Sequence, residues 1–461
     1  MKKFEEIVDL YIQLIDEGKL KPGDQLPTHR ELAYEWGCSI GTASRAYAEL
    51  GRRGFSYGKI GQGTFIYGTK NDEAAIGKGA FFPRDSWPNN DGVVTDLSKN
   101  SYYHPETNTR LQDALQRLAR NNEVSSYLTY FDSRGRPRDR EIAARWLQTQ
   151  LHSVESENII ITQGAQSGLH LAMATLASPG TVVATEAFGY PGIRAAAHEL
   201  DLRLAPIAMD EEGLRADEFE QACGRGNIKL LVTVPTNHNP TGITQSRARR
   251  EKIIEIAARN KVIIVEDSAY GPLHDRDVPA YADLAPQNTI HLTTLSKVFN
   301  PALRIGYLVA PANLVPRLAT KMTTINWMTS PILLDLANFL LQSGQVEAQA
   351  QALMSISARR EKMATDLLEP WLMTRGRSTT APLAHLWVRL SPTQTIAEFV
   401  SSARRENIVV VGGNSFAMSK NIEAHHVRLC LMAEPDERRL EKALRRLAVL
   451  LAQENSPIML T

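Results

Sequence analysis

The sequence lacks the features that define several classes of protein. Its three cysteines, Cys38, Cys223 and Cys430, are odd in number and far apart, which fits neither a disulfide framework nor a zinc cluster and favours a reducing compartment. No run of about 18 apolar residues occurs, and the opening stretch MKKFEEIVDLYIQ has acidic residues where a signal peptide needs an apolar run. We therefore expect a cytoplasmic protein with no membrane partner and no metal site.

The chain also lacks an excess of charge of either sign. Its formal net charge is +1, so any surface that binds nucleic acid must be a local patch. With 461 residues and 43% hydrophobic residues, the chain is long enough for two to four globular domains of roughly 150 residues each.

Residues 1 to 67 have the pattern of a small helical domain that ends in a hairpin. Thr28 and Glu31 have the spacing of a capping box at the start of one helix, and Ser39 is a candidate cap for the next helix. The stretch FSYGKIGQGTFIYG alternates aromatic and polar residues around glycines, which predicts a hairpin. Residues 68 to 94 are rich in Asn, Asp, Gly, Pro and Lys and show no apolar period, so we expect a linker there.

Residues 95 to 461 predict an α/β domain. Short apolar runs alternate with helical stretches, which is typical of a mainly parallel sheet that is covered on both faces. The strand candidates are NIIIT, TVVAT, KLLVTV, VIIVED and TIHLTT. From about residue 340 to 461, long charged helices flank AHLWVRL, IVVVGG and HVRLCL, which predicts a smaller α+β subdomain.

The stretch TLSKVFNPALRIGY groups four residues that suit a phosphorylated cofactor, namely Thr294, Ser296, Lys297 and Arg304. A lysine that forms a Schiff base needs a cofactor fixed beside it, and small hydroxyls with one arginine are able to hold a phosphate. Pyridoxal 5'-phosphate (PLP) meets both requirements. The alternative is a solvated Lys–Arg surface that follows a strand.

Polar residues at the ends of other predicted strands favour the cofactor. Asp267 ends VIIVED, and a carboxylate at the carboxyl end of a strand in an open sheet faces the ligand crevice, where it would keep the pyridine nitrogen protonated. Tyr270, and Asn239 in PTNHNPTG, are placed to contact the oxygen on the cofactor ring. Taken singly, Asp267 is equally a helix cap and Asn239 part of a turn.

Two further motifs add to this set. TQGAQSGLH opens a helix after a strand, so the main-chain amides of Ala165 and Gln166 would point at a phosphate. Tyr190 in FGYPG follows the next strand, where its ring either stacks on the cofactor or is an ordinary core or surface residue. The order of all these motifs along the chain is more specific than any one of them.

That order resembles a fold-type I aminotransferase over residues 95 to 461, and residues 1 to 67 resemble a GntR-type winged helix. Joined in this way, the two are similar to the MocR subfamily of GntR regulators. The resemblance implies that Lys297 forms the internal aldimine with PLP and that the other cofactor contacts come from Tyr130, Ala165, Gln166, Tyr190, Asn239, Asp267, Tyr270, Thr294, Ser296 and Arg304.

Two of the matched residues carry further implications. Tyr130 corresponds to a family tyrosine that reaches the phosphate in the neighbouring subunit, which implies a homodimer. Arg428 in HHVRLCL corresponds to the arginine that clamps the α-carboxylate of the substrate, the alternative being a surface arginine at a strand end.

The first 67 residues carry a local positive charge where a winged helix would meet DNA. From Trp36 to Tyr67, four cationic residues (Arg45, Arg52, Arg53 and Lys59) face one acidic residue, Glu49. By resemblance, the residues that contact DNA are Arg30, Thr42, Arg45 and the wing glycines Gly61 and Gly63. Ile40 stands where many relatives carry arginine, and isoleucine is unable to read guanine. The alternative is a winged helix used for protein docking.

The sequence therefore supports a PLP-dependent transcriptional regulator that binds operator DNA and senses a small amino acid or amine through aldimine exchange at Lys297. A PLP-dependent aminotransferase with an appended DNA-binding domain is the first alternative. A dimerisation module without cofactor is the second, and the intact Lys297, Asp267 and Arg304 disfavour it.

Overall fold

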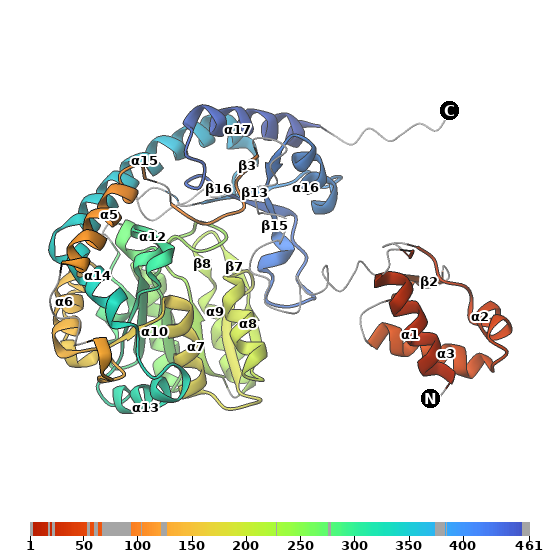
Figure 1. Cartoon of the computed structure of the whole chain (residues 1–461), viewed down its shortest axis with the longest axis horizontal. Coiled ribbons are helices and arrows are strands. Elements are labelled where there is room, and N and C mark those ends of the chain that lie inside the picture. Colours follow the sequence, from red (N-terminus) through yellow and green to blue (C-terminus); the bar gives the residue numbers. More distant parts are fainter. Residues whose placement is uncertain are drawn as a thin grey trace. The chain divides into compact units, whose positions relative to one another are not determined.

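The computed structural model describes residues 3–16, 19–20, 24–52, 56–59, 63–66, 94–102, 104–120, 127–226, 228–274, 278–373, 383 and 385–453. The chain forms two compact units, Met1–Trp87 and Pro88–Thr461 (Figure 1). The predicted linker from residue 68 to 94 lies outside the described residues except for Val94.

The described residues of the first unit form three helices and a hairpin. The helices are α1 (Lys3–Asp16), α2 (His29–Glu35) and α3 (Ile40–Arg52), and the antiparallel strands are β1 (Ser56–Lys59) and β2 (Gly63–Ile66). The predicted capping box is present, because Thr28 Oγ1 accepts from the Glu31 amide at 3.3 Å and the Glu31 carboxylate accepts from the Thr28 amide at 2.7 Å. A small core that includes Ile7, Leu32 and Leu50 joins the helices, so the fold is the predicted winged helix.

A seven-stranded sheet forms the centre of the second unit. Its strand order is β4-β12-β11-β10-β9-β5-β6, and only β12 runs antiparallel to its neighbours. The strands are β4 (Ile159–Thr162), β5 (Val182–Glu186), β6 (Arg203–Ile207), β9 (Ile228–Thr233), β10 (Ile263–Asp267), β11 (Thr289–Thr294) and β12 (Gly306–Val309). All five predicted strands belong to this sheet, which confirms the α/β class.

Helices cover both faces of the sheet. Val265 and Ile264 are neighbours on β10 but pack into different apolar clusters, because successive side chains of a strand point to opposite faces. The cluster around Val265 includes residues of α7 (Ala165–Leu176) and α13 (Val315–Ile325). The cluster around Ile264 includes residues of α9 (Ala216–Arg225) and α10 (Arg247–Arg259). The continuous apolar runs in the sequence reflect this two-sided burial.

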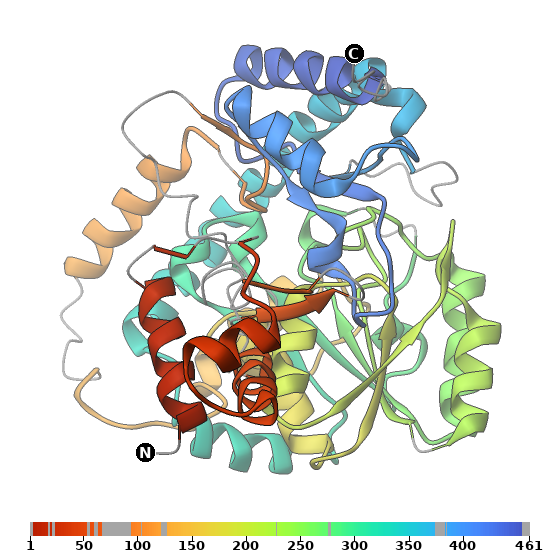
Figure 2. The same ribbon diagram turned by 90° about the vertical axis from the view of Figure 1, so that its right-hand side faces the viewer.

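A smaller sheet lies in the C-terminal part of the second unit. It contains β13 (His385–Arg389), β16 (His426–Cys430) and β15 (Val411–Gly412), while β14 (Ile408–Val409) pairs in parallel with β3 (Thr95–Asp96). The prediction of one strand in IVVVGG was therefore wrong. The stretch forms two short strands, because β14 pairs with β3 whereas β15 pairs with β16. Helices α15 (Gln345–Leu368) and α17 (Glu437–Ala452) run side by side over this part (Figures 1 and 2).

The remaining elements complete the second unit. They are α5 (Thr107–Ala119), α6 (Pro137–Leu147), α8 (Pro191–Glu199), α11 (Tyr281–Leu284), α12 (Leu295–Val298), α14 (Pro331–Gln342), α16 (Ile396–Arg405), β7 (Met209–Asp210) and β8 (Gly213–Leu214). Within the described ranges of both units, no helix combines the length and the apolar character needed to cross a membrane.

Candidate functional site

Lys297 lies on α12, directly after the end of β11. Its side chain is partly buried, and Nζ donates a 2.6 Å hydrogen bond to the main-chain carbonyl of Asn100. The pKa of Lys297 is lowered to about 8, mainly because burial disfavours the charged form; the charges of Arg428 and Arg304 contribute to the lowering, and the charge of Asp267 opposes it. A lysine with this pKa has a substantial neutral fraction near physiological pH, which makes its nitrogen a nucleophile.

Asp267 ends β10 on the face of the sheet that α7 covers. The side chain is buried, and Oδ1 accepts a 3.1 Å hydrogen bond from the amide of Ala269. Desolvation raises the pKa of Asp267 to about 6, and the positive charge of Lys297 opposes this rise. A cationic group placed against this carboxylate would be stabilised strongly, because burial leaves the negative charge poorly solvated.

Tyr270 lies three residues beyond Asp267 and is also buried. Its hydroxyl accepts a 2.6 Å hydrogen bond from the side-chain amide of Asn100, and burial raises the pKa of the hydroxyl. Asn100 therefore contacts two of the predicted cofactor residues. Its main-chain carbonyl accepts from Lys297, and its side-chain amide donates to Tyr270.

The predicted phosphate-binding residues meet where β11, β12 and α7 come together. Thr294 Oγ1 donates to the carbonyl of Ile305 at 2.8 Å and lies 3.0 Å from Ser296 Oγ. Thr294 pairs with Gly306 on β12, and a Cβ atom on Gly306 would lie 2.8 Å from the Ala165 nitrogen. Only a glycine allows the strand to approach the start of α7 so closely.

Arg304 and the amino end of α7 supply positive potential at the same place. Arg304 Nη2 donates to the carbonyl of Gln163 at 3.2 Å, and a Cβ atom on Gly164 would lie 3.0 Å from Nη2. The first four amides of a helix have no acceptor within the helix, so Ala165 and Gln166 are suited to receive an anion. The guanidinium, the amides and the two hydroxyls together match a phosphate.

Arg428 on β16 approaches the same region from the small sheet. The side chain is buried, Nη1 donates to Asn239 Oδ1 at 2.8 Å, and Nη2 donates to the carbonyl of Ser98 at 2.7 Å. The guanidinium lies 4.7 Å from the centroid of the Phe416 ring, and Nε is buried without a partner among the described residues. A buried cation whose partners here are neutral oxygens is suited to a carboxylate.

The other two predicted tyrosines, Tyr190 and Tyr130, have different environments. Burial raises the pKa of Tyr190 to about 12, and the charges of Asp267, Arg304 and Arg428 also act on it, which places its ring beside the groups described above. Tyr130, in contrast, is 77% exposed, and its ring centroid lies 5.3 Å from that of the exposed Trp327. Within one chain, therefore, Tyr130 is not part of the buried group.

Sequence reasoning missed three residues of this site, Asn100, Tyr102 and Cys430. Tyr102 is buried and its hydroxyl has no partner in the described part of the chain. Cys430 Sγ lies 3.9 Å from the Ser98 carbonyl, which also accepts from Arg428, and Cys430 stands two residues after Arg428, so both point to the same face of β16. That alternation was a signal for Cys430, whereas nothing local in SKNSYYHPE marks Asn100 or Tyr102.

These residues fit PLP. Lys297 supplies an amine, Asp267 a buried carboxylate for the pyridine nitrogen, and the start of α7 with Arg304 a cradle for the phosphate. Several buried polar atoms near them, Asn100 Oδ1, Gln166 Oε1 and Arg428 Nε, have no partner among the described residues, which suits a site that receives a polar ligand.

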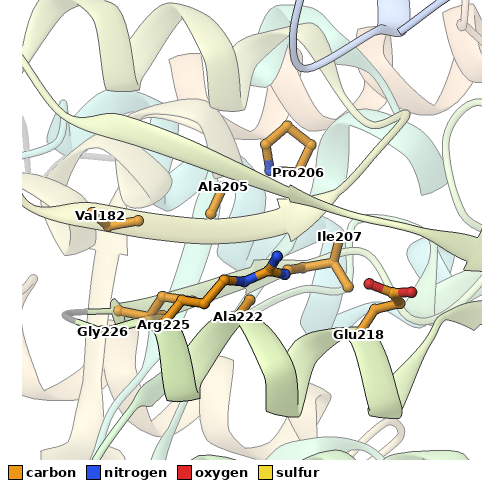
Figure 3. Close-up of a pocket in the computed structure, with 9 residues that line it drawn as sticks. Val182, Ala205, Pro206, Ile207, Glu218, Ala222, Arg225 and Gly226 are labelled. Atoms are coloured by element: carbon orange, nitrogen blue, oxygen red, sulfur yellow. The ribbon is translucent and has the colours of Figure 1, made fainter. Parts of the chain in front are cut away.

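A separate hollow lies at the far edge of the large sheet. Figure 3 shows Arg225 and Glu218 on α9 below β6, with Val182 and Ala205 above them. None of the residues that line this hollow belongs to the group around Lys297, and two strands of the sheet, β9 and β5, separate β6 from β10.

The predicted DNA-binding residues lie in the first unit. Arg30 near the start of α2 and Arg45 on α3 are both exposed, and the Arg45 guanidinium lies 5.0 Å from the centroid of the Phe4 ring. Thr42 Oγ1 lies 2.9 Å from Ser39 Oγ at the start of α3. Gly63 begins β2 with a positive φ of 111°, while Gly61 lies outside the described residues.

Comparisons with protein families match both units. The model of aminotransferase class I and II matches residues 93–447, and the model of the gntR family of bacterial regulatory proteins matches residues 3–66.

Several curated proteins resemble the chain over most of its length. The HTH-type pyridoxine biosynthesis transcriptional regulator PdxR of Corynebacterium glutamicum is 29% identical over 77% of this chain and 76% of its own. The HTH-type transcriptional regulator TauR of Rhodobacter capsulatus is 25% identical over 87% of this chain and 86% of its own.

Among solved structures, an archaeal alanine:glyoxylate aminotransferase superposes with a TM-score of 0.72 at 24% identity, covering 83% of this chain and 93% of its own. The kynurenine aminotransferase of Pyrococcus horikoshii gives the same TM-score at 22% identity, covering 80% of this chain and 93% of its own. At these identities the superpositions show the shared fold.

Proposed function

Because the chain belongs to the aminotransferase class I and II family and carries a gntR-family segment at its amino end, we propose that it is a PLP-dependent transcriptional regulator that responds to a small amino acid or amine. The similarity to PdxR and TauR, which are named as HTH-type regulators, supports this function. The proposal starts from the predicted MocR-like combination of a winged helix with an aminotransferase-like domain.

Each cofactor residue has a proposed role. When bound, PLP supplies an aldehyde carbon that reacts with amines and a ring that withdraws electrons. Lys297 provides the amine that holds it, and Asp267 keeps the ring nitrogen protonated. Asn239 and Tyr270 bind the ring oxygen, and Tyr190 stacks on the ring. The phosphate contacts come from Ala165, Gln166, Thr294, Ser296 and Arg304.

The observation that carries the proposal is the convergence of Lys297, Asp267 and Arg428 from three separate elements on one buried region. Arg428 gives the effector class, because a buried guanidinium with a free Nε favours a carboxylate next to the reacting amine. An amino acid has both an amino group for the reaction at Lys297 and a carboxylate for Arg428, whereas a simple amine has only the amino group.

Three further features complete the proposed function. The first unit binds operator DNA through Arg30, Thr42, Arg45 and the wing around Gly61 and Gly63. The protein acts as a cytoplasmic homodimer in which Tyr130 reaches the phosphate of the neighbouring subunit. The exposed pair of Tyr130 and Trp327 supports this arrangement, since large aromatic side chains at a surface are typical of interfaces.

The test is an absorption spectrum of the purified protein, followed by titration with glycine, other amino acids and methylamine. Wild type should show a yellow chromophore that borohydride fixes covalently, and Lys297→Ala should lose the covalent adduct. Lys362→Ala is the control, because that lysine is 77% exposed. Rapid repeated transamination, with DNA affinity indifferent to every amine that changes the spectrum, would favour the aminotransferase alternative.

A further inference from the structure

Residues 97–102, called here segment 97–102, touch the candidate site at three points. The main-chain carbonyl of Ser98 accepts from Arg428, and the main-chain carbonyl of Asn100 accepts from Lys297. The side-chain amide of Asn100 donates to the Tyr270 hydroxyl. The three distances are 2.7, 2.6 and 2.6 Å.

The same segment is tied to the small sheet. The Leu97 amide donates to the Val409 carbonyl at 2.9 Å, and the Leu97 carbonyl accepts from the Cys430 amide at 2.8 Å. Just before it, β3 pairs with β14. Among the described elements of the second unit, β3 comes first along the sequence, so segment 97–102 follows the part of the chain that leads from the winged helix.

The contact between Lys297 and Asn100 depends on the chemical state of the lysine nitrogen. A free ammonium has three N–H donors, and one of them is given to the Asn100 carbonyl. A nitrogen that is double-bonded to the cofactor has at most one N–H and lies where the cofactor holds it. The Asn100 carbonyl and the cofactor therefore compete for the same nitrogen.

We propose that Asn100 is a positioning residue that holds the Lys297 amino group whenever it is free, and that segment 97–102 conveys this state to β3. The inference rests on the proposed function. Replacement of Lys297 on the cofactor by an effector ammonium would form one C=N bond as another breaks, and two protons would pass from the effector nitrogen to the Lys297 nitrogen, which becomes the free ammonium. The exchange needs neither water nor an oxidant, and it returns Lys297 to Asn100.

This arrangement gives the effector a difference in contacts between two states. A ligand shifts a conformational equilibrium only through such a difference, and here the difference is the hydrogen bond that Asn100 gains or loses. Because the Asn100 side chain also binds Tyr270, a shift of the segment alters the position of the Tyr270 hydroxyl too. The site and the segment therefore respond together.

Hydrogen exchange of the full-length protein, followed by mass spectrometry of peptides that cover residues 94–102, tests the proposal. The first comparison uses cofactor-free wild type and cofactor-free Lys297→Met, which keeps the length of the side chain but has no donor. We expect exchange in this segment to be at least about threefold faster in Lys297→Met, because the amides lose a stabilising contact. Equal exchange in the two proteins would overturn the proposal, whether or not PLP binds.

The second comparison uses PLP-loaded protein with and without saturating methylamine, which has no carboxylate and so leaves Arg428 unengaged. Exchange in residues 94–102 should slow when methylamine is added. Asn100→Ala should retain this response, because the substitution keeps the main-chain carbonyl that accepts from Lys297 and removes only the side-chain bond to Tyr270. Lys362→Ala is the control, since that lysine is 77% exposed and lies outside segment 97–102. A spectral change at Lys297 without any change of exchange contradicts the inference but leaves the proposed function intact, whereas absence of a chromophore contradicts the proposed function.

Discussion

Arg428 and Asn239 meet in the site although 189 residues separate them, and Arg428 Nη1 donates to Asn239 Oδ1 at 2.8 Å. Arg428→Gln keeps a donor but removes the charge. We expect this variant to bind glycine about 10- to 100-fold more weakly, since hydrogen bonds to charged groups contribute about 1.5–3 kcal/mol. Spectroscopic titration of the PLP-loaded protein measures the change.

Methylamine is the control for this variant, because it offers the amine without the carboxylate. The affinity for methylamine should change by less than about threefold, because methylamine has no carboxylate and so loses no ion pair when Arg428 is replaced. If glycine and methylamine lose affinity equally, Arg428 does not bind the carboxylate.

The pKa of Lys297 predicts a pH profile for cofactor binding. Desolvation lowers this pKa to about 8, and only the neutral amine attacks an aldehyde carbon. The rate of chromophore formation after PLP is added should therefore rise with pH and level off above about 8, well below the ordinary lysine pKa of about 10.4. Asp267→Asn should move the profile to lower pH, because the Asp267 charge raises the Lys297 pKa. Stopped-flow absorbance measures both profiles, and a rate that still rises above pH 10 would contradict the prediction.

The close packing around Gly306 predicts that the phosphate cradle does not tolerate a side chain at this position. A Cβ atom there would lie 2.6 Å from the Gly164 carbonyl carbon and 2.8 Å from the Ala165 nitrogen, so Gly306→Ala must displace the start of α7. We expect a loss of PLP affinity, measured by equilibrium titration, and a smaller loss for pyridoxal, which has no phosphate. Gly224→Ala is the control, because a Cβ atom at Gly224 meets no atom within 4 Å. An equal loss for the two compounds would show that the damage is not at the phosphate.

The Glu186 carboxyl predicts a dependence of stability on pH. Desolvation raises its pKa to about 7, against hydrogen bonds from Thr233, Val234 and Thr185 that lower it. Between about pH 4.5 and pH 7 the folded protein thus binds more protons than the unfolded protein, and the free energy of unfolding falls as pH rises. Glu186→Gln should remove this fall and gain about 1–3 kcal/mol relative to wild type on going from pH 5 to pH 8.

Urea unfolding of the full chain at both pH values measures the effect of Glu186→Gln. The exposed Glu155→Gln serves as the control and should follow wild type. If the free energy of unfolding of Glu186→Gln has the same pH dependence as that of wild type, ionisation of Glu186 does not destabilise the folded protein.

Arg45 predicts how the first unit binds DNA. Arg45→Ala should weaken binding to a duplex selected from a random library and reduce the slope of log affinity against log salt by about 1, because one phosphate contact is lost. Arg45→Lys keeps the charge and should retain most of the slope. Fluorescence anisotropy at several salt concentrations measures both. Thermal unfolding provides a check, since Arg45 also packs on Phe4. Unchanged affinity and slope in Arg45→Ala would exclude Arg45 from the interface.

Local signals predicted much of the fold. The capping box of Thr28 and Glu31 predicted the start of α2, and the five apolar runs predicted five strands of the large sheet. Strands β6 and β12 were missed because neither is a continuous buried apolar run: β6 contains Pro206 and is only partly buried, and β12 opens with Gly306. Edge position and antiparallel pairing are decided by neighbours in space, which the local pattern does not contain.

The sequence by itself determined the two domain types, the lysine motif around Lys297 and the acidic end of β10, because each depends on residues that are close along the chain. Only the tertiary structure decided that Asn100 lies against Lys297 and Tyr270. These contacts join residues up to 197 positions apart, and the pairing of β3 with β14 that brings segment 97–102 to the site has no signature in either stretch alone. Long-range pairing follows from the packing of whole elements, so it was visible only once the chain was folded.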